Sequence, residues 1–464
     1  MNNITGNENI VIQNVSDSTI TVSVNGGVPF EIQYLLTELK ALLERHQASS
    51  FQLANTIYNI DSINEVNFGT VLRKRIFNTV LTKKLMEILP QKEKVTTFFQ
   101  DIAKEDKENW AYVRKHAKEA QNLIQESFVW IIAWELRRLF SIGSETKDEK
   151  GEYKQIEERV ESYMQHCFST YRFALYLINA VFLSKLWDEK KRNPQLQTDL
   201  LPIKIFLMAS IQRNLGELRE LFETLLKAFT KEQLAFPFHL EAANFAAYFD
   251  KNSTFYQACL ALEKLERIQN EEVSYSITQC QLAEKYLADI LTHFPFLAQH
   301  QLVSMKKVEY EQVRNQSERY IKNYQVLGQR SKENSTHTLK YDDKPSLTYV
   351  IFFLSPKYAI NLFPLILDYN ALTNDTDFQL LVYENRKENE LQYVCVNNEK
   401  EMPIPHEAVE DKIQVFQDEK EKAEYEKKVK FAIVSRQYQD LVKTLLGIEV
   451  IFAPIKNDAD TFDL

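Results

Sequence analysis

Residues 173–183 read Phe-Ala-Leu-Tyr-Leu-Ile-Asn-Ala-Val-Phe-Leu, the longest strongly apolar stretch of the chain. Asn179 interrupts it, and Arg172 and Lys185 bound it. The stretch is far shorter than the roughly 20 residues that a helix needs to span a bilayer. We therefore predict a helix that is buried in a protein core, and no contact with a membrane.

Helical periodicity continues on both sides of this stretch. Apolar residues recur at steps of three and four, which is typical of amphipathic helices. Only 9 glycines occur in 464 residues, against roughly 7% in an average protein, and this shortage favours long helices. The candidate helices cover residues 70–88, 107–141, 152–188, 200–229, 240–249, 253–269 and 273–326, the last broken near Pro295.

The first 27 residues are rich in Asn, Ser, Thr and β-branched side chains instead. Residues 9–15 and 19–24 predict two short strands that form a hairpin. Open strand edges invite pairing with another chain, so we expect an association tag, although a locally docked or frayed tail is the alternative. The residues expected to carry association are Ile10, Ile12, Ile20, Val22 and Val24.

Beyond the helical region the pattern changes again. A turn is expected at 58–62 and a polar linker at 328–346. Strands of a small sheet are expected at 347–354, 361–367, 378–383 and 391–396, a charged helix at 407–431, and an edge strand at 448–452. The predicted fold is mainly α, an irregular helical array with an N-terminal β-hairpin tag (1–27), a helical domain (28–330) and a small C-terminal α+β module (345–464).

Charge and cysteine usage indicate a cytoplasmic protein. The net charge of −9 gives no overall attraction to nucleic acid or to an acidic membrane. Residues 1–39 contain no Lys or Arg, which excludes the usual signal and transit peptides. Widely spaced cysteines without a CxxC pair favour reduced thiols. They are Cys167, Cys259, Cys280 and Cys395.

No common catalytic or cofactor motif is present. The glycines cannot form GxGxxG or GxxxxGK, the loops that hold phosphates on backbone N–H groups. GxSxG, HExxH and the kinase motifs are also missing. We therefore expect no cofactor, and we assign no catalytic or metal-binding residue.

Several residue pairs are weaker candidates for metal binding or catalysis. His166 with Cys167, or His293 with His300, could bind a metal, and Cys280 with His293 could form a nucleophile and base. Satisfied or exposed histidines explain these residues more simply.

The enzymatic alternative is a metal-dependent nuclease in the C-terminal module. Asp368 ends one predicted strand and Glu384-Asn385-Arg386 ends another, so two carboxylates could hold Mg²⁺. Arg386 stands where such sites use a lysine, and an arginine cannot act as a base. Ordinary polar residues at strand ends are the preferred interpretation.

Nucleic-acid binding through local basic clusters is the remaining possibility. One cluster comprises 73–75 with Lys83 and Lys84, and the other begins at Lys306 and Lys307. Interleaved glutamates make a solvated, mixed-charge surface the preferred interpretation. The sequence gives this partner no firm support.

Four N-terminal segments carry a family resemblance. They are residues 8–15, 18–22, 40–44 and 57–63. These segments resemble the recruitment or oligomerisation modules of bacterial conflict-system proteins, which surround STAND-like NTPases and caspase-like or TPR-bearing effectors in anti-phage defence. The resemblance covers about the first 70 residues and implies an adaptor or sensor that joins itself or another protein of the same system. The chain departs from the NTPase members because it has no P-loop.

Overall fold

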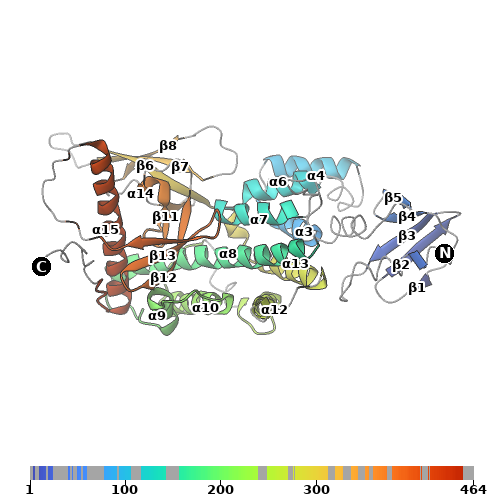
Figure 1. The fold of residues 1–464 in the computed structure, drawn as a ribbon, viewed down its shortest axis with the longest axis horizontal. Coiled ribbons are helices and arrows are strands. Elements are labelled where there is room, and N and C mark those ends of the chain that lie inside the picture. Colours follow the sequence, from blue (N-terminus) through green and yellow to red (C-terminus); the bar gives the residue numbers. More distant parts are fainter. Residues whose placement is uncertain are drawn as a thin grey trace, which may run out of the picture. The chain divides into compact units, whose positions relative to one another are not determined.

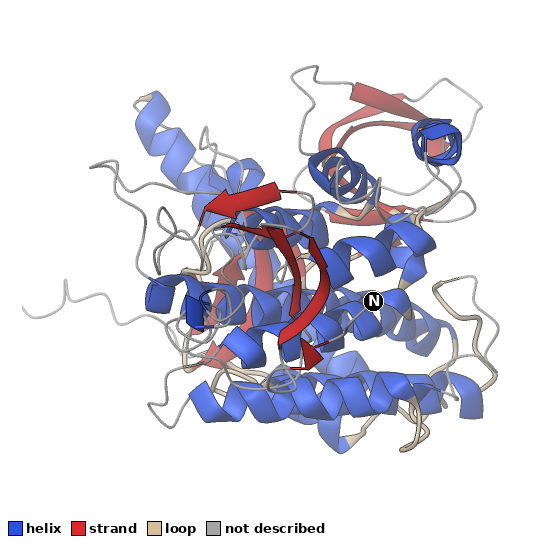
Figure 2. Ribbon diagram, turned by 90° about the vertical axis from the view of Figure 1, so that its right-hand side faces the viewer, coloured by secondary structure: helices blue, strands red, loops and turns tan. Residues whose placement is uncertain are grey.

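The computed structural model is mainly helical, with strands at its N-terminus and an α+β arrangement in its C-terminal region, which confirms the predicted fold class (Figures 1 and 2). The described residues are 4–5, 10–16, 19–24, 40–41, 44, 50–53, 56–59, 78–90, 93–105, 117–142, 156–238, 248–269, 275, 277–311, 319–327, 336–342, 351–354, 359–373, 379–407, 409, 416 and 418–452. The expected helix at 240–249 and the basic residues 73–75 lie almost wholly outside them.

The chain forms two compact units. The first comprises residues 1–125, 135–171 and 254–295, and the second 126–134, 172–253 and 296–464. Helix α8 (Ile156–Arg192) contributes residues to both. The predicted domain boundaries stay predictions, but the range 28–330 also contains strands besides its helices.

The first unit begins with a five-stranded sheet in the order β1-β2-β3-β4-β5. The predicted hairpin is present as β2 and β3, which pair in antiparallel fashion, whereas β3 and β4 are parallel. The turn expected at 58–62 is wrong at its first two residues, which belong to β5. The strands are Ile4–Thr5, Ile10–Ser16, Thr19–Val24, Ser50–Leu53 and Thr56–Asn59.

The first unit also contains most residues of the helices that precede α8 and two helices that follow it. The predicted helix 107–141 is divided in two, and α4 was not predicted from the sequence. The helices are α3 (Thr79–Ile88), α4 (Glu93–Glu105), α6 (Ala117–Ser127), α7 (Trp130–Ile142), α12 (Thr254–Gln269) and α13 (Ile277–Thr292), of which α6 and α7 extend into the second unit.

The helices of the second unit surround the second half of α8. The expected helix 200–229 is two helices, α9 (Leu201–Met208) and α10 (Leu215–Lys231), because Asn214 starts a new helix with a capping box to Glu217. A long helix, α15 (Glu419–Leu446), begins after Asp418, which caps its first turn. The predicted charged helix at 407–431 therefore starts too early and ends too early.

Two antiparallel sheets complete the second unit. One has the order β10-β9-β6-β7-β8 and the other β11-β12-β13-β14. A short helix, α14 (Tyr369–Thr373), follows β11. The strands are β6 (Gln301–Glu311), β7 (Arg319–Val326), β8 (Thr336–Asp342), β9 (Ile351–Leu354), β10 (Ala359–Asn361), β11 (Ile366–Asp368), β12 (Leu380–Lys387), β13 (Glu390–Cys395) and β14 (Glu401–Pro405).

Three predictions about the second unit and its boundary are wrong. The helix expected at 273–326 ends at Thr292, and β6 and β7 occupy its second half. The expected linker at 328–346 contains β8. The described residues 448–452 form no strand. In β6 charged residues alternate with apolar ones only from Lys307 to Glu311, and β7 shows no such alternation. Cross-strand pairing therefore decides between periods that the sequence leaves ambiguous.

The predicted core helix is confirmed. All of residues 173–183 are buried in α8. Phe182 lies within 4.9 Å of Phe229 and 5.6 Å of Phe238, measured between ring centroids. Asn179 is accommodated because its Nδ2 donates to the Leu218 carbonyl at 2.9 Å.

Gly447 gives a test of how α15 ends. Its φ of +68° is left-handed, and its N–H donates to the Lys443 carbonyl at 2.9 Å. An added Cβ would meet nothing within 4 Å, so only backbone strain changes. We expect Gly447→Ala to lower the free energy of unfolding by about 1 kcal/mol. Urea unfolding measures this loss. Gly447→Asn should lower the free energy of unfolding by less, because Asn tolerates a left-handed backbone. Equal losses in the two variants would contradict the interpretation.

Candidate functional site

The residues predicted to carry association lie on β2 and β3. The register pairs Ile10 with Val24 and Ile12 with Val22, while Ile20 lies further along β3. Alternate strand positions share a face, so the register places the five residues on one face of the hairpin.

The edges of that hairpin are partly paired within the chain. β1 pairs with Val11 and Ile12 of β2, and β4 pairs with Thr19, Ile20 and Thr21 of β3. The expectation that both hairpin edges are left open is therefore wrong at these residues. The role of the strands in association stays a prediction, and the outer strands of the whole sheet become its natural location.

Outer strands differ in how they are protected from pairing. β14 carries Pro403 and Pro405, which have no N–H to donate. β8 has an irregular register against β7 between Tyr320 and Lys322. β5 pairs with β4 in uninterrupted register and contains no proline. Among the described outer strands of four or more residues, β5 alone lacks both protections.

Asp368, a candidate metal ligand, is fully engaged. Its Oδ2 accepts hydrogen bonds from the Ser304 hydroxyl and from the Lys306 Nζ, the latter at 2.5 Å. Its Oδ1 accepts the Ala371 N–H at 3.2 Å, at the start of α14. The side chain is buried, and its partners already include a cation. Lys306, expected on a basic helix, lies on strand β6 instead.

Glu384 lies far from Asp368. Asp368 pairs with Leu380 across β11 and β12, and Glu384 is four positions further along β12. Four strand steps correspond to about 13 Å. The two carboxylates therefore do not converge on a shared ion.

Glu384 is instead the extra residue of a β-bulge. The register of β12 against β13 shifts between Tyr383 and Asn385. A bulge redirects a side chain, and the Glu384 carboxylate accepts hydrogen bonds from the Tyr176 hydroxyl and the Arg213 N–H, the latter at 3.4 Å. Burial raises the pKa of Glu384, while Tyr176 and nearby Arg172 oppose that rise.

Arg213 connects this carboxylate to the end of α9. Its Nη2 donates to the Phe206 carbonyl and, at 3.3 Å, to the Ile205 carbonyl. Its Cζ lies 4.6 Å from the centroid of the Phe206 ring. A cation at a helix C-terminus is favourable because the last carbonyls carry partial negative charge.

Two tyrosines complete the same helix end. The hydroxyls of Tyr383 and Tyr438 both donate to the Leu207 carbonyl, Tyr383 at 2.7 Å. Burial raises the pKa of both phenols. The cluster of Tyr176, Arg213, Tyr383, Glu384 and Tyr438 thus joins α8, α9, β12 and α15 within the second unit.

This cluster is closed to reactants. Glu384 is 1% exposed and Arg213 is 2% exposed. A general acid or base must reach its substrate within hydrogen-bond distance, and these side chains reach only the protein around them. The arrangement stabilises the second unit rather than offering chemistry to a ligand.

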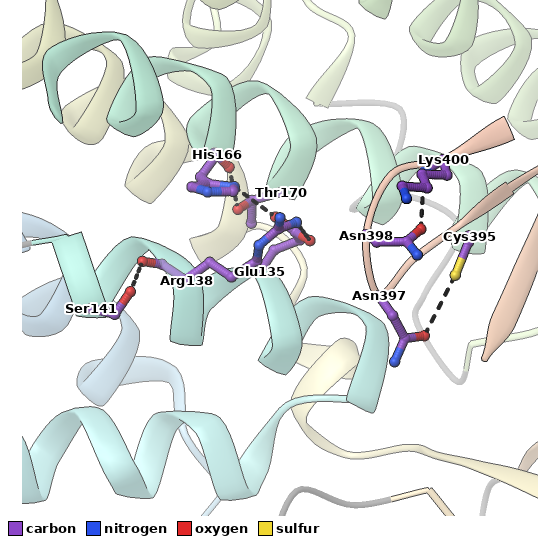
Figure 3. Close-up of polar contacts among 9 residues, drawn as sticks. All are labelled: Glu135, Arg138, Ser141, His166, Thr170, Cys395, Asn397, Asn398 and Lys400. Carbon is purple, nitrogen blue, oxygen red and sulfur yellow. Dashed lines mark hydrogen bonds and ion pairs between the residues drawn. The ribbon is translucent and has the colours of Figure 1, made fainter. Parts of the chain in front are cut away.

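The histidine candidates have local partners. His166 Nδ1 lies 3.3 Å from Glu135 Oε2, and Arg138 donates to Glu135 Oε1 at 3.2 Å (Figure 3). The Arg138 cation competes with any metal for this carboxylate. His293 and His300 each face the carbonyl of the residue four positions earlier, at 2.6 and 2.7 Å.

The cysteines are free and buried, as predicted for reduced thiols. Cys167 is fully buried whereas its neighbour His166 is half-buried, and burial and nearby Cys280 raise the pKa of the Cys167 thiol. Cys280 and His293 are 13 positions apart, about 20 Å along a helix. Cys395 lies 3.9 Å from Asn397 Oδ1 at the β13–β14 turn (Figure 3).

Known proteins give no guide to these sites. The chain matches no protein-family model, no curated protein and no solved structure. Among the described residues, one helix, from Val160 to Arg192, is long and apolar enough to cross a membrane, and 94% of its apolar window is buried. Such burial is common in the core helices of soluble proteins.

Sequence reasoning identified Glu384 and missed its partners. Tyr176 lies in the apolar stretch that predicted the core helix, and Arg213 lies in a range that predicted uninterrupted helix. The one available signal was Asn214 followed by Glu217, a capping-box pattern that marks a helix start. No sequence pattern connects these residues to Glu384, because the contact spans 171 positions.

Arg213 can be tested as the centre of the cluster. Arg213→Met leaves Glu384 buried beside one fewer cation, so we expect a loss of about 3 kcal/mol in the free energy of unfolding. Tyr383→Phe removes one hydroxyl and should lose about 1 kcal/mol. Urea unfolding followed by circular dichroism measures both. Arg192→Met, at an arginine 63% exposed, is the matched control; if Arg213→Met is no worse than this control, the assignment fails.

Proposed function

We propose that this protein is a non-enzymatic adaptor or sensor scaffold of a bacterial defence-type system, which assembles through its N-terminal strands and binds partner proteins. The observation that carries the proposal is the unprotected outer edge of β5 in the N-terminal sheet. The resemblance of the same segments to recruitment modules supports it.

An unpaired strand edge offers a row of N–H and C=O groups to a further strand. In β5 these groups are presented by Thr56–Asn59, which contains neither a charge nor a proline. Two copies of such an edge can pair in antiparallel fashion, and an interface of this kind is symmetric and closes at a dimer. Sheet extension of this type also accepts a strand from a different protein.

A second surface supports binding of partner proteins. Leu201 is 68% exposed and Ile205 is 39% exposed on α9, one helical turn apart. Residues four apart project from the same face. The exposed face of α9 therefore carries two apolar side chains beside the exposed Lys204, which suits a protein contact.

The nuclease remains the second candidate, with less support. Asp368 and Glu384 do lie on neighbouring strands of one sheet. Their separation along β12 and the cation bound to Asp368 oppose a shared metal. The scaffold is therefore preferred.

Assembly is tested by introducing charge at the β5 edge. Ile57→Lys/Tyr58→Lys places like charges opposite each other when two edges pair, which is destabilising. We expect the wild-type chain to form a dimer or larger assembly and the variant to be monomeric. Size-exclusion chromatography with light scattering measures the mass.

Gln195→Lys/Gln212→Lys adds the same charge at exposed positions of the second unit and should leave the wild-type mass unchanged. A monomeric wild-type protein would contradict self-association. The same mass for wild type and the β5 variant, above that of a monomer, would exclude β5 as the assembling edge.

The enzymatic alternative has a direct test. Purified protein is incubated with single- and double-stranded DNA and RNA in Mg²⁺ or Mn²⁺, and products are resolved on denaturing gels. We expect no cleavage above the buffer control, because the carboxylates of Asp368 and Glu384 do not converge. Cleavage that Asp368→Asn abolishes, while Asp440→Asn does not, would favour the nuclease over the scaffold.

A further inference from the structure

Helix α3 depends on another helix for its N-terminal cap. Asn78, at the N-cap position, has a left-handed φ of 68° and makes no side-chain cap hydrogen bond. Its Nδ2 donates to the Leu139 carbonyl at 3.1 Å, and its Oδ1 accepts the Tyr163 hydroxyl at 3.2 Å. The first backbone N–H groups of a helix need acceptors, and the Asn78 side chain does not supply one to them.

Glu284 of α13 supplies that acceptor. Its Oε1 accepts the Leu81 N–H at 3.0 Å. The backbones of Asn78 and Val80 and the Tyr163 side chain lie close enough to this carboxyl group to lower its pKa. The Glu284 side chain is 1% exposed, so this carboxyl group joins the start of α3 to α13 inside the first unit.

The environment of Glu284 opposes its charge. Burial raises its pKa to about 7, although the hydrogen bonds from Leu81, Asn78, Val80 and Tyr163 lower it. Among the described residues, the titratable groups shown to interact with Glu284 are Tyr163 and Cys167 of α8, and neither carries positive charge.

The nearest described ion pair on the two helices is separate from this carboxyl group. Lys84 of α3 binds Asp289 of α13, and both lie further along their helices than Leu81 and Glu284. Because Asp289 accepts the Lys84 cation, the contact between α3 and α13 does not depend on Glu284 alone.

We propose that Glu284 is a proton-dependent latch, which holds the first turn of α3 against α13 when protonated and loosens when the carboxylate ionises. Opening exposes Glu284 to water, where its ordinary pKa is 4.5. Between pH 4.5 and about 7 the closed unit keeps a proton that the open form releases. The contribution to closure is therefore full below pH 4.5 and is lost as pH rises through about 7.

Hydrogen exchange measures the latch directly. Peptides covering α3 are followed by mass spectrometry from pH 5 to pH 8.5 in the full chain, with rates corrected for intrinsic exchange. We expect the protection of α3 to fall by roughly a hundredfold across this range in wild type. In Glu284→Gln, which keeps an acceptor but does not titrate, protection should be nearly independent of pH.

Glu384→Gln is the control, because it removes a buried carboxylate from the other unit and should retain the wild-type response in α3. Tyr163→Phe is an independent second variant. Loss of its hydroxyl removes a hydrogen bond that lowers the Glu284 pKa, so the fall in protection should move to higher pH. A wild-type α3 without pH dependence, or the same dependence in Glu284→Gln, would overturn the proposal. An unmoved midpoint in Tyr163→Phe would do so as well. The test is independent of whether the N-terminal sheet assembles.

Discussion

A carboxylate that leaves water must find hydrogen-bond donors inside the protein, and this constraint organises both units. Glu284 accepts the Leu81 N–H at the start of α3, and Asp368 accepts the Ala371 N–H at the start of α14. Glu384 accepts the N–H of Arg213, directly before the N-cap of α10. Asp368 directly precedes its helix, whereas Glu284 and Glu384 come from distant elements, and in each case a carboxyl group supplies an acceptor where a helix begins.

These contacts are specific as well as stabilising. Apolar packing around α8 supplies the driving force for burial, but rings such as Phe182 and Phe229 can pack in several ways. A buried carboxyl group accepts only an arrangement that brings donors to it. The Tyr176 hydroxyl donates to Glu384 in one unit, and the Leu81 N–H donates to Glu284 in the other. Each therefore fixes the position of its helix relative to a partner.

The same need for hydrogen-bond donors inside the protein explains why the candidate enzymatic residues offer so little chemistry to a ligand. Asp368 and Glu384 are among the most buried carboxylates of the second unit, and their hydrogen bonds are made to the protein itself. Among the described residues, α9 carries the exposed apolar side chains Leu201 and Ile205, and β5 is the outer strand of its sheet. Surfaces of this kind bind other proteins, and this contrast is the physical basis for the scaffold proposal.

The local sequence pattern determined those parts of the protein in which apolar residues recur at one spacing over many positions. Residues 173–183 predict a buried helix, because an apolar run of that length, broken only by Asn179, is unfavourable in water. The alternation in 9–15 and 19–24 fixed a hairpin, because neighbouring strands pair through local contacts. For the candidate site, the sequence located Asp368 and Glu384 but not their roles.

Tertiary structure decided what depends on a distant partner. Residues 301–311 and 319–326 are strands because they pair with each other and the first of them also pairs with β9, although their charges also fit a helix. Glu384 faces Tyr176 and Arg213 because a bulge in β12 redirects it. β5 is the outer strand of the described N-terminal sheet, and the hairpin is partly covered, because β1 and β4 pair with the hairpin and β5 pairs with β4. A sequence records which groups can form hydrogen bonds, and only the folded chain selects their partners.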